Sequence, residues 1–536
     1  MKVVLFNLIL VSAVCGSPRL DPLVNTKKGL IRGLQASDGD YSMFLGIPYA
    51  RVNDSNPFGP SVPYPDFDDV FEAYDDSAVC PQAEVFTKQI IGTLDCLHLN
   101  IYVPNKASTW NRLPVLVWVY GGGFRNGFAK RSVYGPKYLV RNDVILVTLN
   151  YRLGPYGFMC LDTPDIPGNQ GLKDQLSALR WVKENIEAFG GDVNKVTMIG
   201  ESAGGASVDF HLHSAQEKLF DKVIMQSGTT LCPWAMAEAD TRAPMAIAKH
   251  LGFEAEDNAD ALTFLSTVEP KLVTGAAVQL SLTFRPCAEK DFDGVEKFVG
   301  EHPINSQIPK AKDIKILIGH NNREMLHIYA KKTLDSAEGF YVFKKHLETS
   351  FHLRNEDDLV ALVRQFYVGD KDFGENLKWD LMDFESDFRF NHPVHRSIQK
   401  YLDNAATVYH YVFSYSGGRN LNKIKRNITE NGAAHADEIG YIFDVSTLSE
   451  TTTEDDQFVI DRITTLWTNF VKYGDPTPDT SELLPVKWSP VEKDVLHYLD
   501  IDRELTMKRR PFHNRMAFWD LFYKMNHKLL FGYKED

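Results

Sequence analysis

The stretch KVTMIGESAGG, residues 195–205, is the strongest local indication of the fold. Its apolar first half is typical of a buried strand, and the residues after it, 206–212, are compatible with a helix. Between them, GESAG matches the G-x-S-x-G turn that lifts a serine hydroxyl clear of a sheet. A side chain at Gly200 or Gly204 would collide with the neighbouring elements. The strand, the turn and the helix together make Ser202 a candidate nucleophile, whereas the pentapeptide alone is a weak signal.

The composition argues against several classes of protein. The chain has 536 residues, of which 44% are hydrophobic and 24% are charged, and these values are ordinary for a globular protein. Its formal net charge of −13 argues against a nucleic-acid partner, because that kind of binding requires a basic surface. Neither the short apolar run at 3–14 nor any later run reaches the ~18 apolar residues that a membrane-spanning helix requires. We therefore expect neither a nucleic-acid partner nor a membrane span.

The first 16 residues have the pattern of a secretory signal peptide. Lys2 precedes a short apolar run, 3–14, and cleavage is expected near Gly16-Ser17. The sequons at Asn53 and Asn427 are typical of a secreted glycoprotein. We therefore predict an extracellular protein that is glycosylated at these two asparagines.

Buried strands and amphipathic helices alternate along the chain. The segment PVLVWVY, 114–120, is nearly all apolar, as a strand covered on both faces should be. Apolar residues recur at helical spacing over 172–189, and this alternation predicts an α/β protein with a largely parallel sheet. No Pro/Gly/Ser linker is present, which favours a single domain over 17–536. Further strands are expected at 97–103, 144–149, 222–226, 315–318 and 409–415, with long insertions at about 235–305 and 330–405.

A serine nucleophile requires a general base and an acid that orients this base, and in proteins with this turn the chain order is serine, acid, histidine. Glu324 lies just past the strand expected at 315–318, at the sheet edge where catalytic loops gather. His435 lies in the loop after the strand expected at 409–415. The three glycines at 121–123 follow a buried strand and suit an oxyanion hole, because glycine lets a carbonyl approach backbone N–H groups closely.

Ordered motifs along nearly the whole mature chain carry a family resemblance. They are GIPYA at 46–50, DCLHLN at 95–100, YGGGF at 120–124, NYRLG at 150–154, GNQGLKDQ at 168–175, FGGD at 189–192, GESAG at 200–204, QSG at 226–228, GAAHADE at 432–438, WTNF at 467–470 and GDP at 474–476. With them the chain resembles the type-B carboxylesterase/cholinesterase family of α/β-hydrolases, and most of all the secreted carboxylesterases of insects. The resemblance implies a large, mostly parallel central sheet covered by helices, with long insertions that form a gorge over the site.

The resemblance also assigns roles to residues. It implies a carboxylesterase (EC 3.1.1.-, in particular 3.1.1.1) that forms an acyl-enzyme and needs no cofactor and no metal. The partner is then a small-molecule ester. The triad and the oxyanion-hole donors of the family fall on Ser202, Glu324 and His435, and on Gly122, Gly123 and Ala203.

Cysteines supply a further set of expectations. One of the six leaves with the signal peptide, so the mature chain keeps an odd number and at least one thiol has no partner within the chain. The first disulfide of the family falls on Cys80 and Cys96. A second disulfide is expected between Cys232 and Cys287, because both belong to segments expected near the acyl pocket. That pairing leaves Cys160 as a buried free thiol.

The pocket residues are inferred from the same resemblance. Trp234 belongs to a segment similar to the one that lines the acyl pocket in insect relatives, and its bulk favours small acyl groups such as acetate. Phe124, after the glycines, is the second expected pocket residue. Small to medium uncharged esters, for example odorant acetates or xenobiotic esters, are the expected substrates. Of the family's structural salt bridges, the one between Arg152 and Asp192 is expected to be retained.

Four other functions are less compatible with the sequence. A metal hydrolase could use the pairs His211/His213 or His392/His395, but neither pair comes with a third ligand. Choline esters are disfavoured because the loop between the first two cysteines lacks the tryptophan that binds a quaternary ammonium. Juvenile hormone esterases typically carry glutamine where this chain has Glu201, which lowers that alternative without excluding it. A non-catalytic adhesion or binding relative is disfavoured by the intact serine, glutamate and histidine.

Overall fold

The computed structural model describes residues 21–85, 87–334, 336–353, 357–371, 374, 377–448 and 452–534. The signal peptide predicted at 1–16 lies outside these described residues, and its cleavage stays a prediction. Within them, no helix combines the length and the apolar character needed to cross a membrane.

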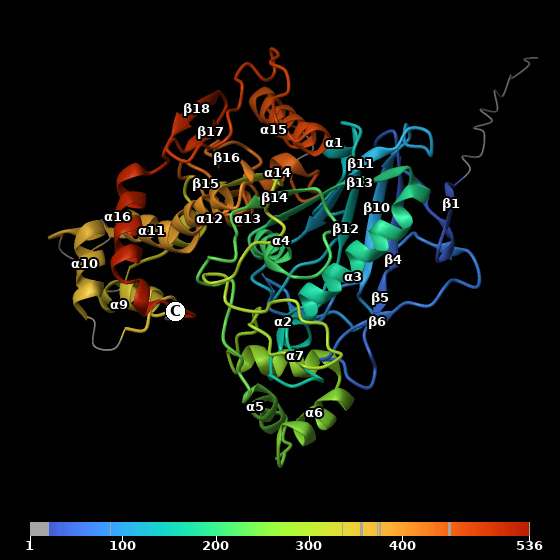
Figure 1. Cartoon of the computed structure of the whole chain (residues 1–536), viewed down its shortest axis with the longest axis horizontal. Helices are drawn as coiled ribbons and strands as arrows, with labels where there is room; N and C mark the ends of the chain where they lie inside the picture. The colour runs from blue at the N-terminus through green and yellow to red at the C-terminus, as the bar shows by residue number, and fades with distance from the viewer. Residues whose placement is uncertain are drawn as a thin grey trace, which may run out of the picture.

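An eleven-stranded sheet forms the centre of the molecule (Figure 1). From β12 through β11, β13, β14, β15 and β16 to β17, neighbouring strands are parallel. Antiparallel pairs add β10, β4 and β3 at one end and β18 at the other. The strands of this sheet, in spatial order, are β18 (Leu505–Arg509), β17 (His497–Ile501), β16 (Thr407–Phe413), β15 (Lys315–Asn321), β14 (Lys222–Gln226), β13 (Gly191–Glu201), β11 (Leu113–Val119), β12 (Ile145–Leu149), β10 (His98–Pro104), β4 (Tyr41–Pro48) and β3 (Leu34–Gln35).

Short strands and sixteen α-helices complete the described part of the chain. The short strands are β1 (Leu23–Thr26), β2 (Gly29–Arg32), β5 (Ala50–Arg51), β6 (Val62–Pro63), β7 (Phe71–Glu72), β8 (Gln82–Ala83) and β9 (Ile90–Ile91). The helices are α1 (Lys137–Val140), α2 (Gly154–Phe158), α3 (Gln170–Asn185), α4 (Ala203–His213), α5 (Ala243–His250), α6 (Asn258–Thr267), α7 (Pro270–Gln279), α8 (Leu326–Tyr329), α9 (Ser336–Leu347), α10 (Asp357–Val368), α11 (Lys378–Ser386), α12 (His392–Asp403), α13 (Leu421–Arg426), α14 (Ile439–Ile442), α15 (Glu454–Tyr473) and α16 (His513–Met525).

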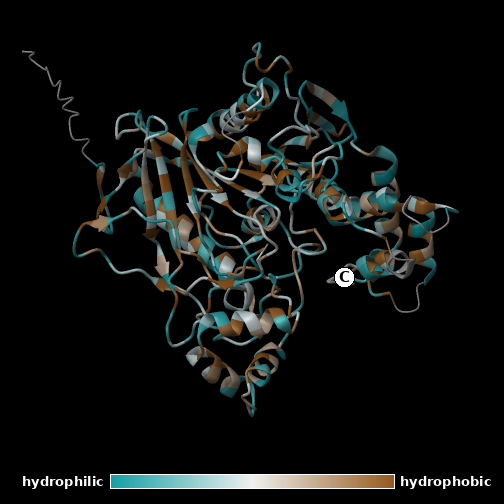
Figure 2. Ribbon diagram, turned by 180° about the vertical axis from the view of Figure 1, so that it is seen from behind, coloured by the Kyte–Doolittle hydropathy of each residue, from teal (hydrophilic) through white to brown (hydrophobic). Residues whose placement is uncertain are grey.

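The central strands are apolar on both faces because helices cover them. Every residue of β11, β12 and β14 is buried, as expected for a parallel sheet between helical layers. Helix α4 contacts β13 and β14, α12 contacts β15 and β16, and α15 contacts β11 and β13. Figure 2 shows hydrophobic residues along these strands and hydrophilic residues toward the outer surfaces of the helices. This architecture confirms the predicted α/β-hydrolase fold with a large, mostly parallel sheet.

The predicted elements lie close to the observed ones. The strand at 222–226 is confirmed without a shift, and the strands expected at 114–120 and 144–149 are shifted or shortened by one residue. The helix expected at 172–189 is α3, which continues as a 3-10 turn, Ile186–Phe189, before Gly190 ends it with φ 80°. The strand before the serine begins at Gly191, earlier than its apolar core suggests, because Gly191 pairs with Leu113.

The two long insertions form separate helical groups (Figure 1). The first contains α5, α6 and α7, and the second contains α9, α10 and α11, beside which α16 lies. The second group builds its own apolar cluster with α16, distinct from the core around the sheet. Trp234 packs against both clusters. The expected single domain over 17–536 stays a prediction.

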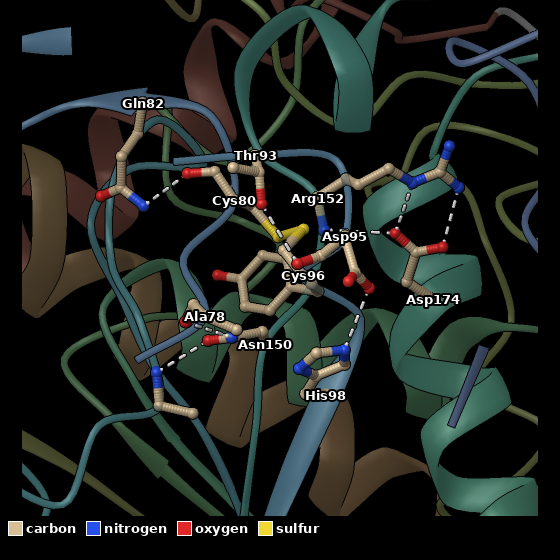
Figure 3. The surroundings of a disulfide bond; sticks show 12 residues. Ala78, Cys80, Gln82, Thr93, Asp95, Cys96, His98, Asn150, Arg152 and Asp174 are labelled. Atoms are coloured by element: carbon tan, nitrogen blue, oxygen red, sulfur yellow. Dashed lines mark hydrogen bonds and ion pairs between the residues drawn. A yellow bond between two sulfur atoms is a disulfide. The ribbon is translucent and has the colours of Figure 1, made fainter. Parts of the chain in front are cut away.

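The first disulfide joins Cys80 and Cys96, with their Cα atoms 5.1 Å apart, as the resemblance implies (Figure 3). Gln82 follows Cys80 in the loop, and its Nε2 donates hydrogen bonds to the Cys80 carbonyl at 3.0 Å and to the Gly127 carbonyl at 2.8 Å. Its Oε1 accepts the Gly127 N–H at 2.8 Å. This disulfide loop is thereby joined to the segment that follows the glycines at 121–123.

The expected pairing of Cys232 with Cys287 is wrong. Cys287 pairs with Cys160, and Cys232 is the free cysteine of the described residues, buried in the core. The segment after Cys160 returns to Cys287. There the Asn169 side-chain amide donates to the Cys287 carbonyl oxygen at 2.8 Å and accepts the Cys287 N–H at 2.9 Å. The Cys232 sulfur instead accepts the N–H of Thr229 at 3.5 Å, within its own turn.

The expected salt bridge between Arg152 and Asp192 is also wrong. Arg152 is fully buried and makes a two-pronged ion pair with Asp174, with both N–O distances at 2.7 Å (Figure 3). Its remaining donors bind the carbonyl oxygens of Pro57 and Gly59, at 3.2 and 2.6 Å. Asp174 belongs to α3, which packs beside the Arg152 loop, whereas Asp192 lies 3.8 Å from the exposed Lys195. The ion-pair partner of Arg152 is therefore set by the packing of α3, which the sequence motif does not indicate.

Candidate active site

A sharp turn presents the Ser202 side chain between strand β13 and helix α4. Ser202 has φ 56° and ψ −122°, a conformation that costs a residue other than glycine energy and persists only where the surroundings enforce it. A Cβ atom added to Gly204 would lie 2.0 Å from the Val119 carbonyl oxygen, and one added to Gly200 would lie 2.3 Å from the Gly204 carbonyl carbon. The strand and the helix can therefore pack this closely only because both residues are glycine.

One hydrogen-bonded chain joins Ser202, His435 and Glu324. The Nε2 atom of His435 lies 2.8 Å from the Ser202 hydroxyl oxygen, and its Nδ1 atom lies 2.6 Å from a Glu324 carboxylate oxygen. Glu324 follows β15 and His435 follows the loop after β16, and the His435 N–H also donates to the Glu324 carbonyl at 3.0 Å. Residues 233 positions apart in sequence are thus brought into contact at the carboxyl edge of the sheet.

Two groups that the sequence motifs did not assign hold Glu324 in place. Its second carboxylate oxygen accepts the Ser227 hydroxyl at 2.6 Å and the Asn321 N–H at 2.7 Å. Burial acts to raise the pKa of Glu324, but the charge of His435 and these hydrogen bonds outweigh burial and bring the pKa below its ordinary value. Ser227 belongs to the QSG motif at 226–228, which marked it as a family residue without giving a role.

Further buried carboxyl groups lie near His435. Glu201 places a carboxylate oxygen 3.2 Å from the Nε2 atom of His435. Burial raises the pKa of Glu201 to about 8, although the charge of His435 acts to lower it. Glu438, whose pKa burial raises to about 7, accepts hydrogen bonds from Gln226 at 2.9 Å and Asn321 at 2.6 Å. Burial acts to lower the pKa of His435, but Glu201 and Glu324 outweigh burial and raise it.

The glycine loop lies directly against the serine. A Cβ atom on Gly121 would lie 2.8 Å from the Ser202 Cβ atom, and one on Gly122 would lie 1.9 Å from the Asn126 carbonyl oxygen. Gly122 and Gly123 have φ values of 117° and 63°, and within the described residues no hydrogen-bond acceptor takes either N–H. Free backbone donors therefore lie in the loop beside the Ser202 side chain.

Ala203 supplies a third candidate donor. It is the first residue of α4, so its N–H is one of those that have no acceptor within the helix. The glycine loop is anchored by Tyr120, whose ring stacks on Tyr151 with centroids 4.5 Å apart. The Tyr151 hydroxyl donates to the Tyr120 carbonyl oxygen at 2.8 Å. The Tyr120 hydroxyl in turn donates to the Tyr151 carbonyl oxygen at 3.1 Å, so stacking and hydrogen bonds together hold this end of the loop.

The two expected pocket residues lie in different surroundings. The Trp234 side chain is half-buried and its indole N–H donates to the Arg389 carbonyl oxygen at 3.0 Å. Its ring lies 5.7 Å from that of Phe390, which in turn lies 4.6 Å from His435. Trp234 is therefore one ring away from the imidazole. Phe124 is fully buried and packs on Phe158 at 5.0 Å.

A cavity of about 630 Å³ lies beside the Trp234 segment. Leu231, Cys232, Pro233 and Met236 line it, but neither Ser202 nor Trp234 does. No residue of the triad therefore lines this cavity.

The remaining predicted positions lie away from this site. Asn427 is exposed and Asn53 is half-buried, and glycosylation of both stays a prediction. His211 lies 3.2 Å from the Gln175 side chain, and His213 lies 2.5 Å from the Ser306 hydroxyl and 3.6 Å from the Asp209 carboxylate.

Comparisons with known proteins identify the family of the chain. The carboxylesterase family matches residues 20–519. Esterase FE4 of Myzus persicae is 32% identical over 497 residues, covering 87% of this chain and 86% of the esterase. Bile salt-activated lipase of Homo sapiens is 31% identical over 561 residues, covering 98% of this chain and 72% of the lipase. The crystal structure of juvenile hormone esterase from Manduca sexta, with OTFP covalently attached, matches with a TM-score of 0.81 and 27% identity, covering 94% of this chain and 100% of that chain. With its sheet, its serine turn and these relatives, the chain belongs to the carboxylesterase family of ester hydrolases.

Proposed function

We propose that the protein is a serine carboxylic-ester hydrolase in which Ser202, His435 and Glu324 form the catalytic triad. The observation that carries the proposal is the unbroken chain of two hydrogen bonds, 2.8 Å from Ser202 to His435 and 2.6 Å from His435 to Glu324. A base within hydrogen-bond reach of a serine, oriented in turn by a buried carboxylate, is the arrangement that activates a serine hydroxyl.

The reaction proceeds through an acyl-enzyme. His435 takes the proton of the Ser202 hydroxyl as the oxygen attacks the ester carbonyl, and Glu324 fixes the imidazole tautomer and stabilises the imidazolium. The N–H groups of Gly122, Gly123 and Ala203 bind the tetrahedral oxyanion. Each such donor stabilises the transition state by about 3 kcal/mol. His435 then protonates the leaving alcohol, and water activated by the same imidazole releases the acid.

Substitution of the serine tests the reaction. Ser202→Ala is expected to lower kcat for p-nitrophenyl acetate by roughly 10⁶-fold and to abolish covalent labelling by an organophosphate. Ser266→Ala is the matched control, because that hydroxyl lies on α6 and bonds only its own helix, at 2.8 Å to the Thr263 carbonyl. Unchanged hydrolysis in the Ser202 variant, or a wild-type chain that does not react with the organophosphate, would overturn the proposal and favour a non-catalytic binding protein.

The substrate class follows from Trp234, which restricts the space for the acyl group one ring away from His435. Small to medium uncharged esters with short acyl chains, such as odorant acetates or xenobiotic esters, suit such a site. Trp234→Ala is expected to raise kcat/KM for p-nitrophenyl butyrate relative to acetate by about tenfold, since each of the added methylenes contributes about 0.8 kcal/mol when buried. Trp110→Ala, at a position that is 97% exposed, is the control. A wild-type preference for long acyl chains would contradict this assignment.

Hydrolysis of juvenile hormone esters is the second candidate. It is supported by the structural likeness to the Manduca sexta enzyme, which extends over 94% of this chain. Glu201 is the residue that opposes it, because juvenile hormone esterases typically carry glutamine at that place. A direct comparison of kcat/KM for juvenile hormone and for short acetates decides between the two. We also propose that the protein is secreted and is glycosylated at Asn53 and Asn427, which mass spectrometry of the natural protein would test.

A further inference from the structure

Three histidines that no part of the esterase mechanism uses meet behind the active site. His320 belongs to β15, His410 to the neighbouring strand β16, and His395 to helix α12, which contacts both strands. In the register of the two parallel strands Ile318 pairs with His410. His320, two residues further along β15 than Ile318, therefore projects from the same face of the sheet as His410. The helix places the third ring over this pair.

The three rings direct unused nitrogen atoms into one small space. One ring nitrogen of each histidine lies within 4.8 Å of those of the other two. The Nε2 atoms of His320, His395 and His410 are all buried and have no hydrogen-bond partner in the described part of the chain. The side chains are only 0%, 9% and 1% exposed, respectively. Buried polar atoms without partners are rare because each costs free energy, so three at one point require an explanation.

The protonation of His320 fits that of a metal ligand. Its Nδ1 atom lies 3.1 Å from the Asn321 carbonyl oxygen, which can only accept, so Nδ1 carries the proton and Nε2 keeps a free lone pair. Histidines that bind metals usually donate their other ring N–H to a carbonyl or carboxylate in this way.

We propose that His320, His395 and His410 bind one divalent transition-metal ion, with Zn²⁺ as the best fit. Three imidazoles suit zinc, copper or nickel, whereas calcium and magnesium require oxygen ligands, and the cluster contains no carboxylate among the described residues. With Zn–N bonds of 2.0–2.1 Å, tetrahedral coordination brings the nitrogens to roughly 3.4 Å apart. Small rotations of the three side chains toward a shared centre bring their nitrogen atoms to this separation. A water molecule completes the coordination.

The site is structural, because it lies in the core and ties two strands and a helix together. It also adjoins the active site, since the residue after His320 is Asn321, whose N–H binds the Glu324 carboxylate. The proposed metal thereby fixes the end of the strand from which the acid extends. The sequence alone predicted no metal site. Only His395 of this cluster belongs to one of the closely spaced pairs that are visible in the sequence, His211/His213 and His392/His395.

The full-length protein, stripped with a chelator and dialysed, tests the proposal by titration with ZnCl₂ and with CoCl₂. We expect one tightly bound Zn²⁺ per chain by elemental analysis, a rise in Tm on addition of Zn²⁺, and visible cobalt absorption bands of a nitrogen-ligated site. His410→Phe should lose all three signals. His392→Gln is the matched control, because His392 lies on the same helix but already bonds Asp520 at 3.0 Å. His435→Gln should also keep the signals, which excludes binding at the candidate active site.

Two results would overturn the proposal. One is a stripped wild-type chain that takes up no tightly bound Zn²⁺ and gives no cobalt spectrum, which would indicate a buried water shared by three neutral imidazoles. The other is a His410→Phe variant that binds zinc as the wild-type chain does. If that variant does not fold, the cobalt spectrum of the wild-type chain decides the question. None of these measurements depends on esterase activity, so the metal site and the proposed function can fail separately.

Discussion

The imidazole of His435 lies between two carboxyl groups, and their charges determine its acidity. Glu201 faces its Nε2 atom at 3.2 Å and Glu324 binds its Nδ1 atom at 2.6 Å. Both carboxylates favour the imidazolium, and they raise the pKa of His435 although burial acts to lower it. A general base must be neutral to accept a proton, so the rate of hydrolysis should rise as the pH passes upward through this pKa.

Glu201→Gln is therefore expected to move the acid limb of the profile of kcat/KM against pH to lower pH. The substitution keeps the shape of the side chain but removes the largest charge effect that raises the pKa of His435. Hydrolysis of p-nitrophenyl acetate across the pH range measures the shift. Glu438→Gln gives a graded comparison, because Glu438 has a weaker effect on His435 and its variant should move the limb less. An acid limb that stays in place in the Glu201 variant contradicts the assignment of His435 as base.

Glu324→Gln tests the acid. An amide in this place cannot stabilise the imidazolium and can reverse the imidazole tautomer, so kcat should fall by about 10³–10⁴-fold. Ser227→Ala removes one of the two hydrogen bonds to the far carboxylate oxygen and should lower kcat only about tenfold. Steady-state kinetics measure both effects, and near-ultraviolet circular dichroism checks that the fold is retained. A Glu324→Gln variant with more than about a tenth of the wild-type kcat would remove Glu324 from the mechanism.

The sequence indicated which residues would meet at this site but not which groups would support them. Ser202 could be chosen because its glycines and its strand–helix setting are local properties, and Glu324 and His435 because chain order restricted the candidates. Glu201 belongs to the same turn, but its place in the sequence predicts no effect on His435. Its effect depends on the distance to His435, which is created by tertiary packing between segments more than 200 residues apart.

Strand β13 and helix α4 meet at a turn that tolerates no added atom. The Cβ atom of an alanine at 204 would lie 2.0 Å from the carbonyl oxygen of Val119, which belongs to the neighbouring strand β11 and cannot move alone. Gly204→Ala should therefore lower the free energy of unfolding by about 3 kcal/mol or more, measured by urea titration.

A half-buried helical glycine with space around it provides the control for that substitution. Gly275 lies within helix α7, and an added Cβ atom would meet nothing closer than the Ile90 side chain at 3.6 Å. Gly275→Ala should raise the free energy of unfolding by about 0.5–1 kcal/mol, because alanine favours the helix and restricts the unfolded chain. If the two variants unfold at the same urea concentration, the close approach at the turn does not limit stability.

The pattern of apolar residues located the strands well but did not define where each strand begins and ends. The strand at 222–226 has clear boundaries because all of its residues are apolar or lie at its ends. Strand β13 was expected to begin at its apolar core, yet it extends back to Gly191 because Leu113 on β11 supplies a partner there. Strand limits therefore depend on the neighbouring strand as well as on local sequence.

Across the whole molecule, the sequence did not supply the pairing of the second disulfide. Cys160 and Cys287 are 127 positions apart, and their approach depends on how the segment around Asn169 folds back onto the first insertion. Cys232 was assigned to this bridge because its segment was expected near the same pocket. In the folded chain its sulfur is instead bound within a local turn by Thr229, 3.5 Å away.

Thiol chemistry on the intact protein distinguishes these two pairings. Without reductant the native protein should not react with Ellman's reagent, because Cys232 is buried and burial raises the pKa of its thiol to about 12, which leaves almost no thiolate at pH 8. In denaturant one thiol per chain should react with Ellman's reagent. Alkylation of the denatured protein followed by peptide mapping should place the alkyl label on Cys232. Peptides that contain Cys160 and Cys287 should be recovered joined to each other. As the control, the Cys232→Ala variant should show no reactive thiol in denaturant. An alkyl label on Cys160 in the wild-type protein would instead indicate that Cys232 is paired with Cys287.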